Sequence, residues 1–206
     1  MANAARPKRP ARPSAAGAVK ARHRRAFGFQ TQEAQVRLIR FGGRIRIIKP
    51  RHGERKSAKR DFHEQMIAHS LFPQNYIKPV GVSYVMENGR PVWGVVSEIV
   101  KGRGRDYKDY LKWCYGPVEG HSKLERAAKR HEEFAKQCAK PFAIECLKQT
   151  GIKLNYHPAN VCNIGGRPFF FEMIILGPAQ LKKHIESMPP AEKAKLERLY
   201  KGSFGG

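Results

Sequence analysis

Residues 35–49 read QVRLIRFGGRIRIIK, and this stretch decides how the first half of the chain folds. On both sides of Gly42 and Gly43, apolar residues alternate with arginines, which is the period-two pattern of a half-buried strand. Two adjacent glycines adopt the positive φ angles of a two-residue turn without steric cost. The stretch therefore predicts an antiparallel β-hairpin with a basic face, to which Arg44 and Arg46 contribute.

The next segments predict one helix and a second hairpin. Residues 61–72, DFHEQMIAHSLF, place apolar side chains at helical spacing, and Asp61 can cap the first turn. Residues 77–85 (IKPVGVSYV) and 91–99 (PVWGVVSEI) are typical of strands, and the intervening Asn-Gly pair at 88–89 favours a tight turn. The order of elements up to residue 100 is therefore strands, helix, strands.

Longer hydrophobic periods follow and predict a mostly helical second half. Helices are expected over 106–113 and over 122–150, with a break near Pro141, because proline cannot donate the helical hydrogen bond. VCNI and RPFFFEMII flank Gly165-Gly166 and predict a further hairpin. Two closing helices are expected over 178–187 and 191–200, separated by Pro189-Pro190.

The charge of the chain indicates an anionic partner. Forty lysines and arginines against 17 acids give a formal net charge of +23, and most of this excess falls within the segment 1–60. Nucleic acid or a ribonucleoprotein is therefore the first partner to consider.

The segment 1–25 lacks acidic and aromatic side chains and cannot build a core, which predicts a basic arm. An RNA- or DNA-binding tail, a solubilising terminus and an organelle transit peptide are the three interpretations of this arm. The nucleic-acid-binding candidates are the basic residues of the arm and of the first hairpin: Arg6, Lys8, Arg9, Arg12, Lys20, Arg22, Arg24, Arg25, Arg44 and Arg46.

Other classes of protein are disfavoured. The four cysteines form no CxxC pair and no zinc-ligand spacing, which favours reduced thiols in the cytoplasm, with organelle targeting by the basic arm as the alternative. No apolar run approaches the roughly 18 residues of a membrane-spanning helix. We therefore expect no membrane partner.

Four positions in this order resemble the protein-kinase-like superfamily, in particular its small atypical members of the RIO and aminoglycoside-phosphotransferase type. Lys49 ends the second hairpin strand, where the resemblance implies the lysine that binds the ATP phosphates. Glu64, in the expected helix that follows, takes the position of the carboxylate that pairs with this lysine. In NYHPANV, Asn155 takes the position of the catalytic Asp base and Asn160 that of a magnesium ligand. Glu172 takes the position of the second magnesium ligand.

The chain departs from the pattern of that superfamily at three places. Asn155 is an amide and cannot accept a proton as a base does. Glu172 replaces a shorter Asp. GFQTQEAQV retains only Gly28 of the glycines that let backbone amides approach phosphates.

The resemblance implies an α+β, bilobal, minimal kinase-like fold. Its parts are the basic arm (1–25), a small antiparallel-sheet N-lobe with one helix (26–100), and a truncated, mostly helical C-lobe (101–206). The segment SEIVKG resembles the hinge between lobes, so the backbone of Glu98 to Val100 is expected to meet the adenine edge. ATP and magnesium are the cofactors that the resemblance implies.

Three functions remain open on the sequence alone. The favoured hypothesis is a catalytically impaired, pseudokinase-like protein that acts mainly by binding nucleic acid or a ribonucleoprotein. The second is a minimal ATP-dependent phosphotransferase with weak or atypical activity. The third is an RNA-binding, ribosome-associated structural protein.

Overall fold

The first hairpin forms as the alternating pattern predicts. The structure is a computed structural model, and it describes residues 36–100, 106, 109 and 122–205. Strands β1 (Arg37–Phe41) and β2 (Arg44–His52) pair antiparallel across Gly42 and Gly43, whose φ angles are +56° and +74°. These left-handed values explain why glycines occupy the turn.

Helix α1 (Arg55–Leu71) begins well before the expected start, so the assignment of Asp61 as its N-cap is wrong. Residues 55–60 contain neither glycine nor proline, and Ala58 is fully buried. Packing of this first part of the helix therefore extends α1 back to the residue after Glu54. Asp61 instead lies within the helix, where it accepts a 2.9 Å hydrogen bond from Gln65.

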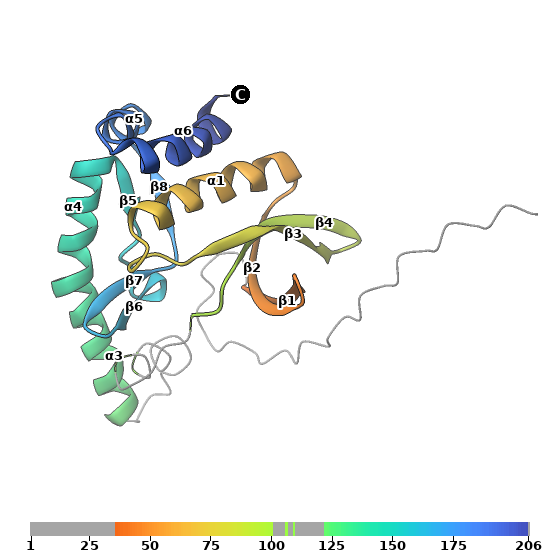
Figure 1. Cartoon of the computed structure of the whole chain (residues 1–206). Coiled ribbons are helices and arrows are strands. Elements are labelled where there is room, and N and C mark those ends of the chain that lie inside the picture. The colour runs from red at the N-terminus through yellow and green to blue at the C-terminus, as the bar shows by residue number, and fades with distance from the viewer. Residues whose placement is uncertain (1–35, 101–105, 107–108, 110–121, 206) are drawn as a thin grey trace, which may run out of the picture.

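The second hairpin completes a four-stranded antiparallel sheet. Strands β3 (Pro79–Glu87) and β4 (Arg90–Ser97) are joined by Asn88 and Gly89, both at positive φ, as expected for an Asn-Gly turn. The strand order is β1-β2-β4-β3. Figure 1 shows α1 lying between this sheet and α6.

The helical segment expected over 122–150 forms without the break predicted at Pro141. It consists of α3 (Ser122–Phe134), a π-helical turn η1 (Ala135–Ala139) and α4 (Lys140–Thr150). Pro141 lies in the first turn of α4 and cannot donate to the carbonyl four residues earlier. The widened π turn accommodates this missing hydrogen bond, so the chain continues as a helix.

The long apolar run RPFFFEMII is divided between two sheets. β6 (Val161–Ile164) and β7 (Arg167–Phe170) form the hairpin expected around Gly165-Gly166, preceded by the 3-10 turn η2 (Pro158–Asn160). β8 (Met173–Ile175) instead pairs with β5 (Ile152–Leu154). Because the two strands have different partners, the chain leaves the sheet at Phe171 and Glu172.

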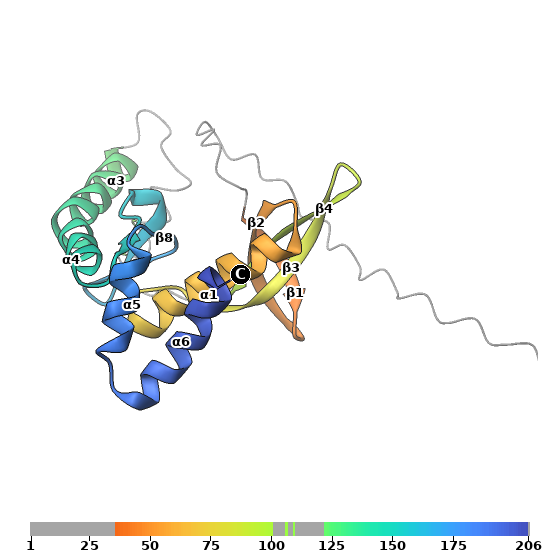
Figure 2. The same cartoon turned by 90° about the horizontal axis from the view of Figure 1, so that it is seen from above.

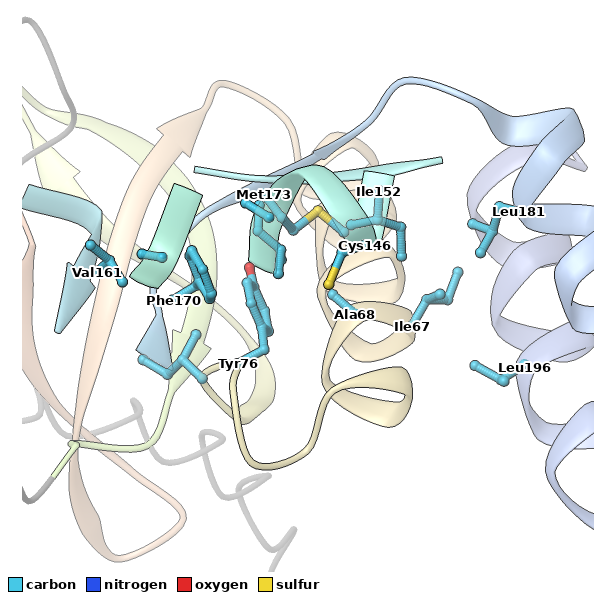
Figure 3. Packing of buried hydrophobic residues seen from close by; sticks show 14 of the residues in the cluster. Ile67, Ala68, Tyr76, Cys146, Ile152, Val161, Phe170, Met173, Leu181 and Leu196 are labelled. Carbon is cyan, nitrogen blue, oxygen red and sulfur yellow. The ribbon is translucent and has the colours of Figure 1, made fainter. Parts of the chain in front are cut away.

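The closing helices are α5 (Pro178–Glu186) and α6 (Pro190–Phe204), which extends beyond the expected end at Tyr200. Figure 2 shows α6 running beside α1. The hydrophobic core joins α1, α4, the short strands and both closing helices (Figure 3), through residues that include Ile67, Tyr76, Ile152, Phe170, Leu181 and Leu196. The helices and the four-stranded sheet together confirm the α+β class with a small antiparallel sheet.

In the part of the chain that the structure describes, no helix has the length and apolar character needed to span a bilayer.

Candidate functional site

Lys49 is presented by the centre of the sheet. It lies on β2 opposite Val95 of β4, and its strand neighbours Ile48 and Pro50 are buried on the other face. Because side chains alternate along a strand, Lys49 emerges on the opposite face from these two residues. There its Nζ forms an ion pair with Glu172, 123 residues further along the chain.

Arg51 reaches the same carboxylate through a β-bulge. The register between β2 and β4 shifts between Pro50 and His52, so Arg51 is the extra residue on β2. Its Nη2 lies 2.6 Å from Glu172 Oε1, the oxygen that also contacts Lys49. Two cations therefore share one carboxylate oxygen.

Asn155 binds the other oxygen of Glu172. Its side-chain Nδ2 donates to Oε2 over 3.1 Å, and its backbone amide donates to the Glu172 carbonyl over 2.9 Å. Three residues at sequence-predicted positions, Lys49, Asn155 and Glu172, therefore meet in space. We call them, together with Arg51, the Glu172 cluster.

The Glu172 carboxylate is charged and tightly held. Its side chain is 13% exposed, and burial by itself would raise its pKa. The hydrogen bond from Lys49, the charges of Lys49 and Arg51 and the hydrogen bond from Asn155 outweigh burial, so its pKa is lowered. The net charge of the cluster at neutral pH is +1, which suits an anionic ligand.

The loop that carries Asn155 and Asn160 is ordered by its own hydrogen bonds. Asn155 Oδ1 accepts from the His157 amide over 3.0 Å, and the Asn160 amide donates to the His157 carbonyl over 2.7 Å. His131 of α3 packs beneath this loop, with Nε2 2.9 Å from the Pro158 carbonyl. The loop therefore holds both asparagines without depending on a ligand.

Asn160 lies at the buried end of this loop. It is 5% exposed, its carbonyl accepts from the Phe171 amide over 2.9 Å, and its Nδ2 has no partner among the residues that the structure describes. A buried amide nitrogen without an acceptor is costly in a folded protein. Asn160 thus offers a hydrogen-bond donor and an amide oxygen beside the start of β6.

The expected ion pair between Lys49 and Glu64 is wrong. Glu64 accepts a 3.0 Å hydrogen bond from Arg60, one turn earlier on α1, while Lys49 is paired with Glu172. Burial raises the pKa of Glu64 against the opposing effect of Arg60. Arg60 lies four residues before Glu64 on the same helix and is therefore a closer partner for it than Lys49 on the sheet.

The segment expected to meet an adenine edge follows β4 directly. The Glu98 amide donates to the Lys78 carbonyl over 3.0 Å, and its carboxylate lies 3.7 Å from Arg46 and 3.8 Å from Lys78. Both groups of Glu98 therefore have partners within the chain. Val100 packs against the hydrophobic core.

The basic candidates of the first hairpin differ in accessibility. Arg44 is exposed beside the turn, whereas the Arg46 side chain is 17% exposed and faces Glu98. The other basic candidates, from Arg6 to Arg25, and Gly28 of the expected phosphate loop lie outside the residues that the structure describes.

Sequence reasoning missed two polar partners. Arg51 could have been found from its place two residues after Lys49, but the bulge that aims it cannot be inferred from a periodic pattern. His52 Nε2 lies 3.1 Å from Asp61 Oδ2 and joins β2 to α1. This contact arises because α1 starts early and brings Asp61 beside the end of the strand.

Oxygen donors are the metal-binding groups that this site offers. Asn160 and Glu172 carry the amide and carboxylate oxygens that Mg²⁺ prefers. Within residues 36–100, 106, 109 and 122–205, no three His, Cys, Asp or Glu side chains are grouped to hold a metal ion. Both Glu172 oxygens are engaged by Lys49, Arg51 and Asn155 and the local charge is +1, so the cluster does not favour a free metal cation.

Comparisons with family models, with curated proteins and with solved structures find no match to this chain.

Proposed function

We propose that the protein is a kinase-fold binding module. It takes a magnesium-bound nucleoside triphosphate at the Glu172 cluster, transfers phosphate poorly, and acts mainly by binding nucleic acid or a ribonucleoprotein. In this proposal, the β1–β4 sheet with α1 is the N-lobe, and the helices and short strands from α3 to α6 form the truncated C-lobe.

The observation that carries the proposal is the meeting of Lys49, Asn155 and Glu172. The resemblance gives all three residues functional positions, and Lys49 and Asn155 both contact Glu172 although they are far apart in the sequence. Phosphoryl-transfer folds need a lysine and a carboxylate together, because positioning and charge neutralisation provide most of the catalysis. The same pair of groups binds phosphates even where transfer is weak.

An apolar surface beside Lys49 supports a place for a nucleobase. Leu38 pairs with Ile47 across β1 and β2, so both side chains lie on the sheet face that carries Lys49. Leu38 is 69% exposed, and Ile45, two residues before Ile47 on the same face, is 60% exposed. Ile47 is paired with Ser97, the residue before Glu98. A flat purine on this surface would direct its phosphates toward Lys49.

Weak transfer follows from the chemistry of Asn155. An amide does not take up a proton near neutral pH, and its Nδ2 is already donating to Glu172. Loss of a positioned base typically lowers a rate by about 10² to 10⁴. Binding of the nucleotide does not require the base and is retained.

The nucleic-acid part of the proposal rests on charge. The chain carries +23, and eight of its lysines and arginines lie in residues 1–25. Exposed Arg40 and Arg44 add positive charge at the β1–β2 hairpin. Removal of residues 1–25 should weaken binding and flatten its salt dependence by about 0.7 in logarithmic slope for each lost contact to a single-stranded phosphate.

Thermal unfolding with Mg-ATP tests the nucleotide site. Ligand at one hundred times its dissociation constant stabilises a protein by about 2.7 kcal/mol, which raises the melting temperature. We expect this rise in the native chain and in a Lys195→Met control, since Lys195 is an exposed lysine of α6, a helix that contributes no residue to the cluster. Lys49→Met should abolish it, each variant being compared with its own ligand-free melting temperature.

Measurements with Mg²⁺ alone and with metal-free ATP distinguish binding at this site from nonspecific electrostatic binding to the basic protein surface. Mg²⁺ alone should give no shift, because the cluster itself is positive. ATP with a chelator should give a smaller shift than Mg-ATP, because the proposed ligand is the magnesium-bound nucleotide and the metal would no longer link the phosphates to the protein's oxygen atoms. A shift that survives Lys49→Met and disappears with added salt would contradict the nucleotide site. It would leave the third interpretation of the sequence, an RNA-associated structural protein.

A further inference from the structure

The β3–β4 hairpin exposes an aromatic surface on the sheet face that carries Lys49. Tyr84 pairs with Trp93 across the two strands, and Met86 pairs with Pro91 beside them. Tyr84 is 49% exposed and Met86 56%, while the Tyr84 and Trp93 rings are 5.0 Å apart and inclined at 51°. We call Tyr84, Met86 and Trp93 the aromatic platform. Figure 1 shows its hairpin projecting away from the helical part of the molecule.

Arg55, at the start of α1, borders this platform. The Arg55 guanidinium carbon lies over the Trp93 ring, 5.5 Å from its centre. Lys56 and Lys59 are exposed in the same part of the helix, and neither forms an ion pair with any residue that the structure describes. Residues 51–60 hold five lysines and arginines against one acid, Glu54, and two of the five, Arg51 and Arg60, are paired with Glu172 and Glu64. The platform therefore lies in a positive field.

This combination suits one kind of partner. Exposed aromatic rings offer flat faces for stacking, and neighbouring cations offer contacts to phosphates. In a duplex the base faces are already stacked on one another, so they are not available to Tyr84. In a single strand the bases can turn outward and reach a protein ring.

We propose that the aromatic platform binds single-stranded nucleic acid. One base stacks on Tyr84, and the adjacent phosphates lie against Arg55, Lys56 and Lys59. The inference rests on the proposed nucleic-acid function and adds to it a strand type and a site in the folded part of the chain, separate from residues 1–25.

The test is fluorescence anisotropy of the full chain with labelled oligonucleotides of about 12 nucleotides, single-stranded or as a duplex. Affinity is measured at several salt concentrations between about 50 and 200 mM. Tyr84→Ala should weaken single-strand binding by about 5- to 100-fold without changing the salt slope, because stacking is not an ionic contact. Tyr84→Phe should bind as the native chain does, since it keeps the ring.

Two further sets of variants identify the source of each effect. Lys56→Gln with Lys59→Gln should lower the logarithmic salt slope by about 0.7 for each lost contact. Ile174→Ala, an exposed apolar residue of β8 that is 59% accessible, is the matched control and should change nothing. Quenching of Trp93 by the bound strand, in a Trp113→Phe background, reports contact with the platform independently of affinity.

Several results would overturn the inference. Equal affinity for single strands and duplexes, with Tyr84→Ala unchanged and binding lost on removal of residues 1–25, would assign binding to the arm and leave the proposed function intact. A change of oligomeric state with Tyr84→Ala, without a change in nucleic-acid affinity, would make the platform a protein interface. Absence of nucleic-acid binding by the full chain would overturn this inference and the nucleic-acid part of the proposed function together, whereas the Mg-ATP shift would still test the nucleotide site.

Discussion

Asn155 donates twice to Glu172, from its side-chain amide to the carboxylate over 3.1 Å and from its backbone amide to the carbonyl over 2.9 Å. The residue to which the resemblance gives the position of a catalytic base therefore holds the acid to which it gives the position of a metal ligand. A carboxylate at residue 155 could not make the side-chain bond, because it would present an acceptor to an acceptor.

Asn155→Asp should lower the stability of the fold and raise the rate of phosphate release. Loss of the side-chain hydrogen bond and a second negative charge beside Glu172 should lower the free energy of unfolding by about 1–3 kcal/mol. If the site holds Mg-ATP as proposed, the new base should increase phosphate release by about 10²-fold. Urea denaturation and a phosphate-release assay check the two effects. Asn163→Asp, an exchange of the same kind in the β6–β7 hairpin, is the control.

Glu172→Gln and Glu64→Gln should change the pH dependence of stability in opposite directions. The folded pKa of Glu172 lies below the ordinary value of 4.5, so its charge stabilises the protein above that value, and this stabilisation is lost as pH falls through the folded pKa. The folded pKa of Glu64 lies above 4.5, so its charge destabilises the protein as pH rises through that pKa.

Melting temperatures measured between about pH 3 and pH 7 test this pair of variants. At neutral pH, Glu172→Gln should melt below the native chain and Glu64→Gln above it. Both differences should shrink toward the acidic end, where the native carboxyl groups are protonated. Equal effects of the two substitutions at neutral pH would contradict the opposite pKa directions.

Gly94→Ala, on β4, should displace Lys49 on the neighbouring strand β2 and so weaken the Glu172 cluster. A Cβ at Gly94 would collide with the backbone of Lys49 and Pro50, which leaves no room for a side chain between β2 and β4. Overpacking of this kind costs about 1–3 kcal/mol and should displace Lys49. Gly53→Ala is the control, because no atom of the described residues beyond its chain neighbours lies within 4 Å of its added Cβ. Chemical denaturation and the Mg-ATP shift measure the two consequences, and a native-like Gly94→Ala would argue against the register of β2 and β4.

The described cysteines should react with a thiol reagent at different rates. Cys138 is exposed, whereas Cys146 and Cys162 are buried, and burial raises the pKa of the Cys146 thiol to about 12. At about pH 8 we expect Cys138 to be labelled first, and the two buried thiols only after unfolding. Peptide mapping after timed alkylation gives the order, and early labelling of Cys146 would show that α4 is not packed as described.

Local chemistry accounts for the parts of the fold that the sequence predicts well. The turns at Gly42-Gly43, Asn88-Gly89 and Gly165-Gly166 form where expected, because each needs backbone angles that few residues adopt. Alternation identified β1 and β2 for a similar reason, since a period of two is incompatible with a helix. These features depend on neighbouring residues alone.

The errors occur where distant packing decides the outcome. α1 starts at Arg55 because Ala58 in its first turns is buried in the folded protein. The helix continues past Pro141 because the π-helical turn η1 accommodates the hydrogen bond that proline cannot donate. The run ending in EMII is divided because β8 has a partner, β5, that precedes the whole β6–β7 hairpin in the chain. None of these contacts has a signature in a short window.

The sequence by itself determined the turns, the strand alternation, the excess of positive charge and the identity of the groups available for chemistry, because each is a property of adjacent residues. Only the tertiary structure decided which carboxylate Lys49 would bind. Glu64, the expected partner, is held by Arg60 on its own helix, and the bulge at Arg51 aims a second cation at Glu172. An ion pair across 123 residues depends on how β2 and the segment between β7 and β8 pack together, and no local pattern contains that information.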